Sequence, residues 1–110
     1  MVFGGVYVKP KVKKDRAQHE REASQILKII HNLRFFHNYS KKEVCDILEI
    51  DVRMIVYWEN GEYGRGIKDF DLYPRVIRNC IRIYSYKKPF SEKEIKFVES
   101  LNRINVRLNS

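Results

Sequence analysis

The chain has 110 residues, 44% of them hydrophobic, and its 22 Lys and Arg against 14 Asp and Glu give a formal net charge of +8. The length suits one domain with a single core, and the hydrophobic fraction is too high for a disordered basic tail. No apolar run approaches the roughly 20 residues of a membrane helix, and the positive charges follow the apolar N-terminal stretch instead of preceding it, as they would in a signal peptide. The two cysteines form no disulfide framework, so we expect a reduced protein of the cytoplasm, or of the host cell cytoplasm if the source is viral. The positive excess favours a polyanionic partner.

Residues 1–14 are expected to form a basic arm beside a single domain that takes up residues 15–110. In this arm two adjacent glycines are followed by Lys9-Pro10-Lys11-Val12-Lys13-Lys14, without a helical period. A flexible basic arm can follow DNA or enter a minor groove. A terminus that is simply unfolded fits the same residues equally well.

The first helix is predicted to start after Asp15, whose side chain can cap free backbone N–H groups, and to run to about His37. Its first half, Arg16–Glu22, is almost wholly polar. We therefore expect this half to project from the core or to rest on something else, such as a second subunit. In the second half, apolar residues recur three and four positions apart, as on one helical face: Ile26, Ile29, Ile30 and Leu33.

Two short helices are predicted next. Ser40-Lys41-Lys42-Glu43 is a capping box, in which the side chain of each end residue binds the backbone N–H of the other. It opens a helix that ends near Glu49, and Asp51 can cap a further helix from Val52 to about Glu59. Trp58 belongs to the apolar face of that helix, and Gly61 ends it because glycine takes the left-handed conformation without a Cβ clash.

A loop over residues 62–70 and two longer helices complete the expected fold. One helix starts near residues 71–74 and stops before Lys87-Lys88-Pro89. The last one, Ser91 to Leu108, is expected to bury a stripe and to serve either in dimerisation or in closing the domain's own core: Ile95, Val98, Leu101 and Ile104. The prediction is thus an all-α chain of five helices.

The segment from Tyr39 to Gly61 resembles the Cro/CI-type (lambda-repressor-like, Xre) family of helix-turn-helix DNA-binding domains. Two parts of the pattern lie at the family's spacing: Ser40-Lys41-Lys42-Glu43 opens the first short helix, and Trp58-Glu59-Asn60-Gly61 ends the second. The resemblance covers about residues 26–84 without an insertion in the motif. It implies a sequence-specific regulator of transcription, which we expect to be a repressor although the sequence does not distinguish repression from activation, and which binds double-stranded DNA as a homodimer on a pseudo-palindromic operator.

Carried over position by position, the resemblance implies a role for each of several residues. Ser40 and Lys41 would hold a phosphate at a helix N-terminus, and Asn60 would bind the backbone beyond the recognition helix. Arg34 and Glu59 would form a partly buried ion pair. We add Arg65 and Lys68 of the following loop as candidate phosphate contacts. The groove-facing positions would be Val52, Arg53, Val56 and Tyr57.

This sequence departs from the family pattern at Glu49, where glycine is usual. Glu49 must therefore adopt positive φ at a cost of roughly 1 kcal/mol, or the turn must bend differently. The recognition helix is also unusual, because the two valines cannot bind base edges through hydrogen bonds. Arg53 is then the one side chain able to contact guanine O6 and N7 together, and we expect DNA shape and the arm to supply further specificity.

Other functional classes find little support in the residues. His19, His31 and His37 are spaced so that they do not share a helical face, and no cysteine pair is near, so neither a metal nor another cofactor is expected. No catalytic constellation or phosphate loop is present, so we expect no enzyme, and a small-molecule ligand is not expected. Two alternatives stay open: a protein-interaction module of the antitoxin or inhibitor kind, and architectural DNA binding driven by net charge.

Overall fold

The computed structural model describes residues 15–110, and this part of the chain consists of five α-helices without a strand. For residues 15–110 the prediction of an all-α fold with five helices is confirmed. The arm predicted for residues 1–14 lies outside the described residues. The helices are α1 (Arg16–His37), α2 (Lys41–Leu48), α3 (Val52–Glu59), α4 (Leu72–Ile83) and α5 (Glu92–Leu108).

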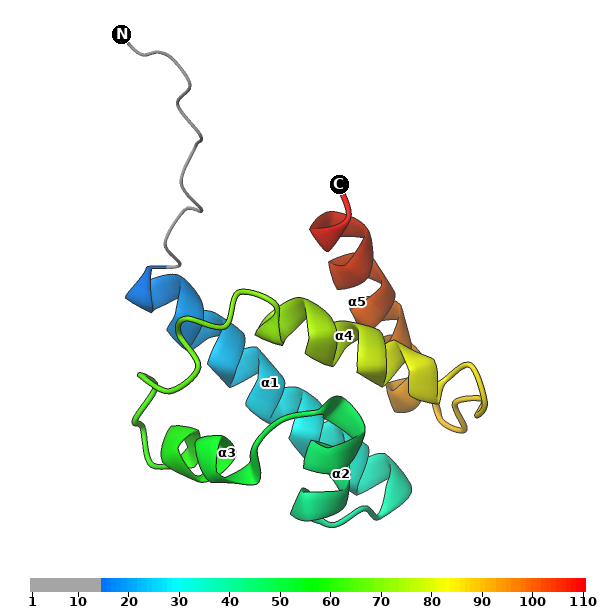
Figure 1. Cartoon of the computed structure of the whole chain (residues 1–110). Helices are drawn as coiled ribbons and strands as arrows, with labels where there is room; N and C mark the ends of the chain where they lie inside the picture. Colours follow the sequence, from blue (N-terminus) through cyan, green and yellow to red (C-terminus); the bar gives the residue numbers. More distant parts are fainter. Residues whose placement is uncertain (1–14) are drawn as a thin grey trace, which may run out of the picture.

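The longest helix, α1, runs through the molecule and packs against α2, α3 and α4. The short helices α2 and α3 lie together along one side of it, α4 crosses it, and α5 packs mainly against α4 (Figure 1). One core joins all five, and its fully buried side chains come from every helix: Leu33, Leu48, Ile55, Trp58, Ile77 and Leu101. No helix in the described part is long and apolar enough to cross a membrane.

Side-chain caps set the starts of four helices at the predicted places. Asp15 accepts a hydrogen bond from the backbone N–H of Gln18, and Asp51 from that of Arg53. At α2 both bonds of the capping box form: Ser40 Oγ accepts from Glu43 N at 3.1 Å, and Glu43 Oε1 accepts from Ser40 N at 2.8 Å. Ser91 caps α5 in the same way through Glu94 N. Each cap satisfies backbone donors that the helix itself leaves unpaired.

The turn between α2 and α3 depends on a left-handed residue that is not glycine. Glu49 has φ 61° and ψ 49°, so the first of the two possibilities for this position is the one found. Its backbone N–H closes the end of α2 by hydrogen bonding to Asp46 O at 3.2 Å. A side chain in this conformation costs roughly 1–2 kcal/mol. At the end of α3, Gly61 takes φ 82°, as predicted for the stop.

The polar first half of α1 is exposed at Arg16, Ala17, Gln18 and Arg21, but it buries His19. His19 is 1% exposed, and its ring stands edge-on to Trp58 with a centroid separation of 5.8 Å. The carbonyl oxygen of Arg65 accepts hydrogen bonds from His19 Nε2 at 2.9 Å and from Trp58 Nε1 at 3.0 Å. Through His19, this half of α1 therefore packs on the loop that follows α3, which belongs to the same chain.

The predicted buried stripe of α5 is confirmed at Leu101, which is buried, and at Ile104, which packs against the core, but it is wrong at the start of the helix. Ile95 is 43% exposed, and the residues that face the core are Glu94, Phe97 and Leu101. The cause is a carboxylate that finds partners inside the protein: Glu94 accepts from Tyr84 OH at 2.7 Å and from Phe90 N at 2.8 Å. Because these bonds replace water, Glu94 can take a core position that the sequence pattern assigns to isoleucine.

Candidate nucleic-acid interface

The outer side of α3 is open to solvent. Arg53 keeps 84% of its side chain exposed and Val56 is 44% exposed, while Val52 and Tyr57 are half-buried. The opposite side of the same helix holds Ile55 and Trp58 in the core. Of the four predicted groove-facing residues, Arg53 and Val56 thus lie on the accessible side, Tyr57 is half-buried, and Val52 packs against the core.

Arg53 does not extend freely from α3, because its guanidinium binds the residue that caps the helix. Nε and Nη2 of Arg53 donate to the two carboxylate oxygens of Asp51 at 3.2 and 2.9 Å. These hydrogen bonds lower the pKa of Asp51 below its usual value and raise that of Arg53. Both side chains are mostly exposed, so water competes with the pair. The two-donor edge that would read guanine is occupied by a carboxylate in the unbound protein.

The end of α2 that was predicted to hold a phosphate is also paired with a carboxylate. The N–H groups of Lys41 and Lys42 have no helical acceptor by position, but Lys41 Nζ binds Glu59 Oε1 at 2.7 Å. This contact ties the start of α2 to the end of α3. Lys41 and Glu59 are only partly exposed, at 32% and 41%.

The predicted ion pair between Arg34 and Glu59 is wrong. Glu59 is bound to Lys41, and Arg34 Nε donates instead to Tyr39 O at 3.3 Å. Arg34 is exposed and Glu59 keeps 41% of its side chain exposed, so neither charge is buried. The physical reason is proximity. The first turn of α2 places Lys41 next to Glu59, whereas Arg34 lies in the last turn of α1 and binds the segment that follows this helix.

The remaining predicted residues lie at the C-terminal end of α3. Asn60 ends the helix and donates through Nδ2 to Val56 O at 3.0 Å. The guanidinium of Arg65 stacks on the ring of Tyr57, 4.3 Å from its centroid, and Lys68 is exposed. A hollow of about 430 Å³ separates α3 from this loop, and the residues that line it are Asp51, Arg53, Met54, Tyr57, Arg65 and Gly66.

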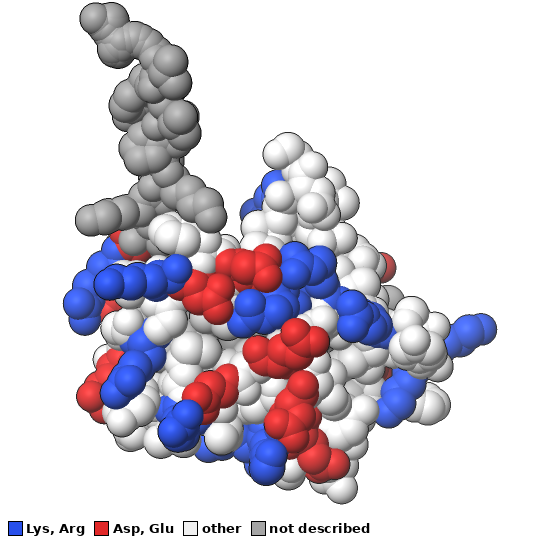
Figure 2. Space-filling view, viewed as in Figure 1, with Lys and Arg blue, Asp and Glu red and all other residues white. Residues whose placement is uncertain are grey.

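The charge around α2 and α3 is negative, which the total charge of the chain conceals. Residues 40–71 contain five Lys and Arg but eight Asp and Glu, a net charge of −3. Residues 72–110 contain nine Lys and Arg and three Asp and Glu, a net charge of +6. Figure 2 shows acidic and basic side chains interleaved over one face of the molecule. A polyanion that approached α3 would have to displace carboxylates from their cations.

Other groups that could carry chemistry are buried and engaged. His37 Nε2 lies 3.0 Å from Tyr84 OH and 3.3 Å from Glu94 Oε2, beneath the junction of α4 and α5. Burial lowers the pKa of His37, although nearby Glu94 opposes the shift. Burial also raises the pKa of the Cys80 thiol to about 12. Among the described residues no group of three or more His, Cys, Asp and Glu could hold a metal ion.

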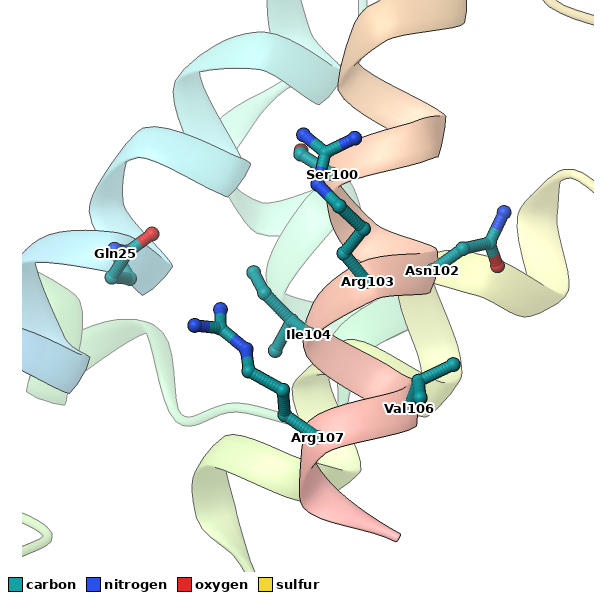
Figure 3. A pocket seen from close by; sticks show the side chains of 7 residues that line it. All are labelled: Gln25, Ser100, Asn102, Arg103, Ile104, Val106 and Arg107. Carbon is teal, nitrogen blue, oxygen red and sulfur yellow. The ribbon is translucent and has the colours of Figure 1, made fainter. Parts of the chain in front are cut away.

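A wider hollow of about 660 Å³ lies elsewhere, between α1 and the C-terminal half of α5. Arg107 extends from α5 toward the side where Gln25 of α1 lies (Figure 3). The side chains that line the hollow contain amides, a hydroxyl and two guanidinium groups, but no carboxylate, imidazole or thiol: Gln25, Ser100, Asn102, Arg103, Ile104, Val106 and Arg107. Such a lining offers no general base of the usual kinds that could activate the Ser100 hydroxyl as a nucleophile.

Comparisons of the chain with protein-family models, with curated proteins and with solved structures found no match. The resemblance to the Cro/CI family therefore rests on the motif residues of the sequence alone.

Proposed function

We propose that the chain is a sequence-specific double-stranded DNA-binding protein of the Cro/CI helix-turn-helix class, and that it acts as a transcriptional repressor. The observation that carries this proposal is the arrangement of α2, the left-handed turn at Glu49 and α3. The capping box starts α2 and Trp58 anchors α3 in the core, while the outer side of α3 stays accessible. A helix presented in this way can enter a major groove.

In this proposal α3 contacts the base edges in the major groove, and the start of α2 and the segment after α3 bind the phosphate backbone of the DNA. Arg53 contacts guanine after leaving Asp51, and the valines meet thymine methyl groups. The start of α2, with Ser40 and Lys41, takes one phosphate, and Asn60, Arg65 and Lys68 take others. Because carboxylates hold Arg53 and Lys41 in the unbound protein, DNA binding exchanges these partners, and breaking each solvent-accessible ion pair costs up to about 1 kcal/mol.

One short helix makes few base contacts, so we propose that two copies bind half-sites roughly 34 Å apart. The C-terminal helix α5 supports this, since two apolar side chains that lie three helical turns apart on one face remain exposed: Ile95 at 43% and Val106 at 68%. A dimer through α5 would cover these residues. Shielding of apolar surface is the usual source of stability in such contacts.

The proposal is tested by selecting bound duplexes from a random pool with the full-length protein. A palindromic consensus is expected. Arg53→Ala should then lower affinity about 10- to 100-fold and relax the preference at one base pair, whereas Lys41→Ala should weaken all sequences alike. Arg21→Ala, on an exposed face of α1, is the matched control. Recovery of no consensus, or unchanged affinity in both test variants, would refute the proposal.

A second candidate function is favoured by the net charge of −3 on residues 40–71. An acidic α2–α3 surface suits a basic protein partner, as in an antitoxin or an inhibitor. Charge reversal separates the two functions. Replacing Glu62 and Asp46 by lysine should strengthen DNA binding by reducing repulsion, but should weaken capture of a basic protein. A stoichiometric protein partner in the native host, with no DNA affinity at 0.15 M salt, would favour this second function.

A further inference from the structure

The cations on the α2 side of the molecule differ in whether a carboxylate holds them. Lys41, Lys42 and Arg53 each form an ion pair within the α2–α3 region. Arg75 and Arg78 of α4 bind Asp69 and Asp71. By contrast, no ion pair joins Arg82, Lys87 or Lys88 to a carboxylate in the part of the chain that the structure describes. These last three stand at the end of α4 and in the loop that leads to α5.

The fold brings this loop to the start of α2, across 48 residues of sequence. Lys87 Nζ donates to Tyr39 OH at 3.1 Å and lies 5.2 Å from the centroid of the Tyr39 ring. Tyr39 immediately precedes Ser40, the N-cap of α2. Lys87 is thus held next to the helix end that the proposed function assigns to a phosphate.

A hollow of about 260 Å³ joins the two segments. Its lining combines two cations and two phenol rings with two isoleucines and the buried amide of Asn79. The residues that line it are Tyr39, Ile47, Asn79, Arg82, Ile83, Tyr86 and Lys87. Tyr86 is 84% exposed and Lys88 is also exposed. Figure 2 shows basic side chains at the end of the molecule where Figure 1 places the α4–α5 loop.

We propose that Arg82, Lys87 and Lys88 form a second backbone-binding surface, which takes the DNA strand held by α2 and extends the contact beyond the groove-reading helix. This inference rests on the proposed function. An ammonium group has three donors, so Lys87 can bind a phosphate while it keeps its bond to Tyr39. Tyr39 is then a positioning residue. Because no carboxylate has to be displaced from these cations, each phosphate contact releases counterions at little internal cost.

Salt dependence of binding is the measurement that tests this surface, made on the full chain with its selected duplex and with an unrelated duplex. Each phosphate contact contributes about 0.9 to the slope of log affinity against log salt. Lys87→Gln combined with Lys88→Gln should therefore flatten the slope by about 1.8 on both duplexes. Tyr39→Phe, which keeps the ring but removes the hydroxyl acceptor, should reduce affinity by less than the combined lysine variant.

The matched control is Arg21→Gln combined with Lys28→Gln, which removes two charges from a face lined by α1 residues alone. An equal flattening in this control would show a non-specific charge effect and would overturn the inference. An unchanged slope in the loop variant, while Arg53→Ala still weakens binding, would overturn the inference and leave the proposed function standing. Absence of duplex binding by the unaltered chain would overturn both.

Discussion

Glu94 is a buried carboxylate whose removal should destabilise the domain far more than removal of an exposed glutamate from the same helix. It is 2% exposed and accepts hydrogen bonds from Tyr84 OH at 2.7 Å and from Phe90 N at 2.8 Å. Burial, together with the hydrogen bond to Glu94, raises the pKa of Tyr84 far above its usual value, so the phenol keeps the proton that it donates. These bonds join the end of α4, the loop and the start of α5.

The size of the effect follows from the two bonds. A hydrogen bond to a charged group contributes about 1.5–3 kcal/mol, so Glu94→Ala should cost about 3–5 kcal/mol once partial entry of water is allowed for. Glu94→Gln should cost about 1 kcal/mol, because its amide can accept from Phe90 N and donate to Tyr84 OH. At about 4 °C per kcal/mol for a domain of this size, the alanine variant should melt at least about 12 °C lower.

Urea titration followed by circular dichroism measures these free energies of unfolding directly. Glu99→Ala provides the control, since Glu99 is exposed on the same helix and its loss should stay within about 0.5 kcal/mol. The reasoning would be refuted if Glu94→Ala and Glu99→Ala had the same stability, because the two hydrogen bonds would then contribute nothing beyond what water supplies.

Three further predictions concern stability. Burial lowers the pKa of His37. The contribution of neutral His37 to folding stability is therefore complete at pH values above its ordinary pKa of 6.5, and it is lost as the pH falls through the lowered pKa of the folded state. In thermal melts from pH 7.5 to 5, the melting temperature should fall more steeply in the unaltered chain than in His37→Gln. Glu49→Gly should raise the free energy of unfolding by about 0.5–1 kcal/mol by relieving the positive φ of 61°, and a decrease in urea midpoint would contradict this. Gly66→Ala should lower the free energy of unfolding by about 1 kcal/mol more than Gly61→Ala. A Cβ added at Gly66 would lie 2.7 Å from Met54 Sδ, whereas a Cβ added at Gly61 would meet no atom within 4 Å. Equal melting temperatures for the two variants would contradict this prediction.

Local signals in the sequence were sufficient for most of the fold. Capping residues located the starts of α1, α2, α3 and α5, since a cap depends on two or three neighbouring residues. The tight turn required a left-handed residue, and Glu49 has that conformation. The apolar face of α3 was also predictable, because Trp58 and Ile55 lie at helical spacing and both are buried.

The errors occurred where a polar group finds its partner far along the chain. Glu94 takes the inner position at the start of α5 that was predicted for Ile95, and nothing near Glu94 in the sequence identifies Tyr84, ten residues earlier, as its donor. Burial of His19 depends on the Arg65 carbonyl, 46 residues away. Glu59 pairs with Lys41 because the fold places them together. The pair of Arg53 with Asp51 is the exception, because an acidic cap two residues before an arginine was a local signal for it.

The shared acceptor at Arg65 has a practical consequence for following this protein in solution. Trp58 is the chain's one tryptophan, and its indole N–H ends on the same carbonyl oxygen as the imidazole of His19. Its fluorescence therefore reports whether the segment after α3 is packed against Trp58 and His19. A shift of emission to longer wavelength with unchanged helical ellipticity would mark release of that segment alone, so one optical signal can separate local opening from global unfolding.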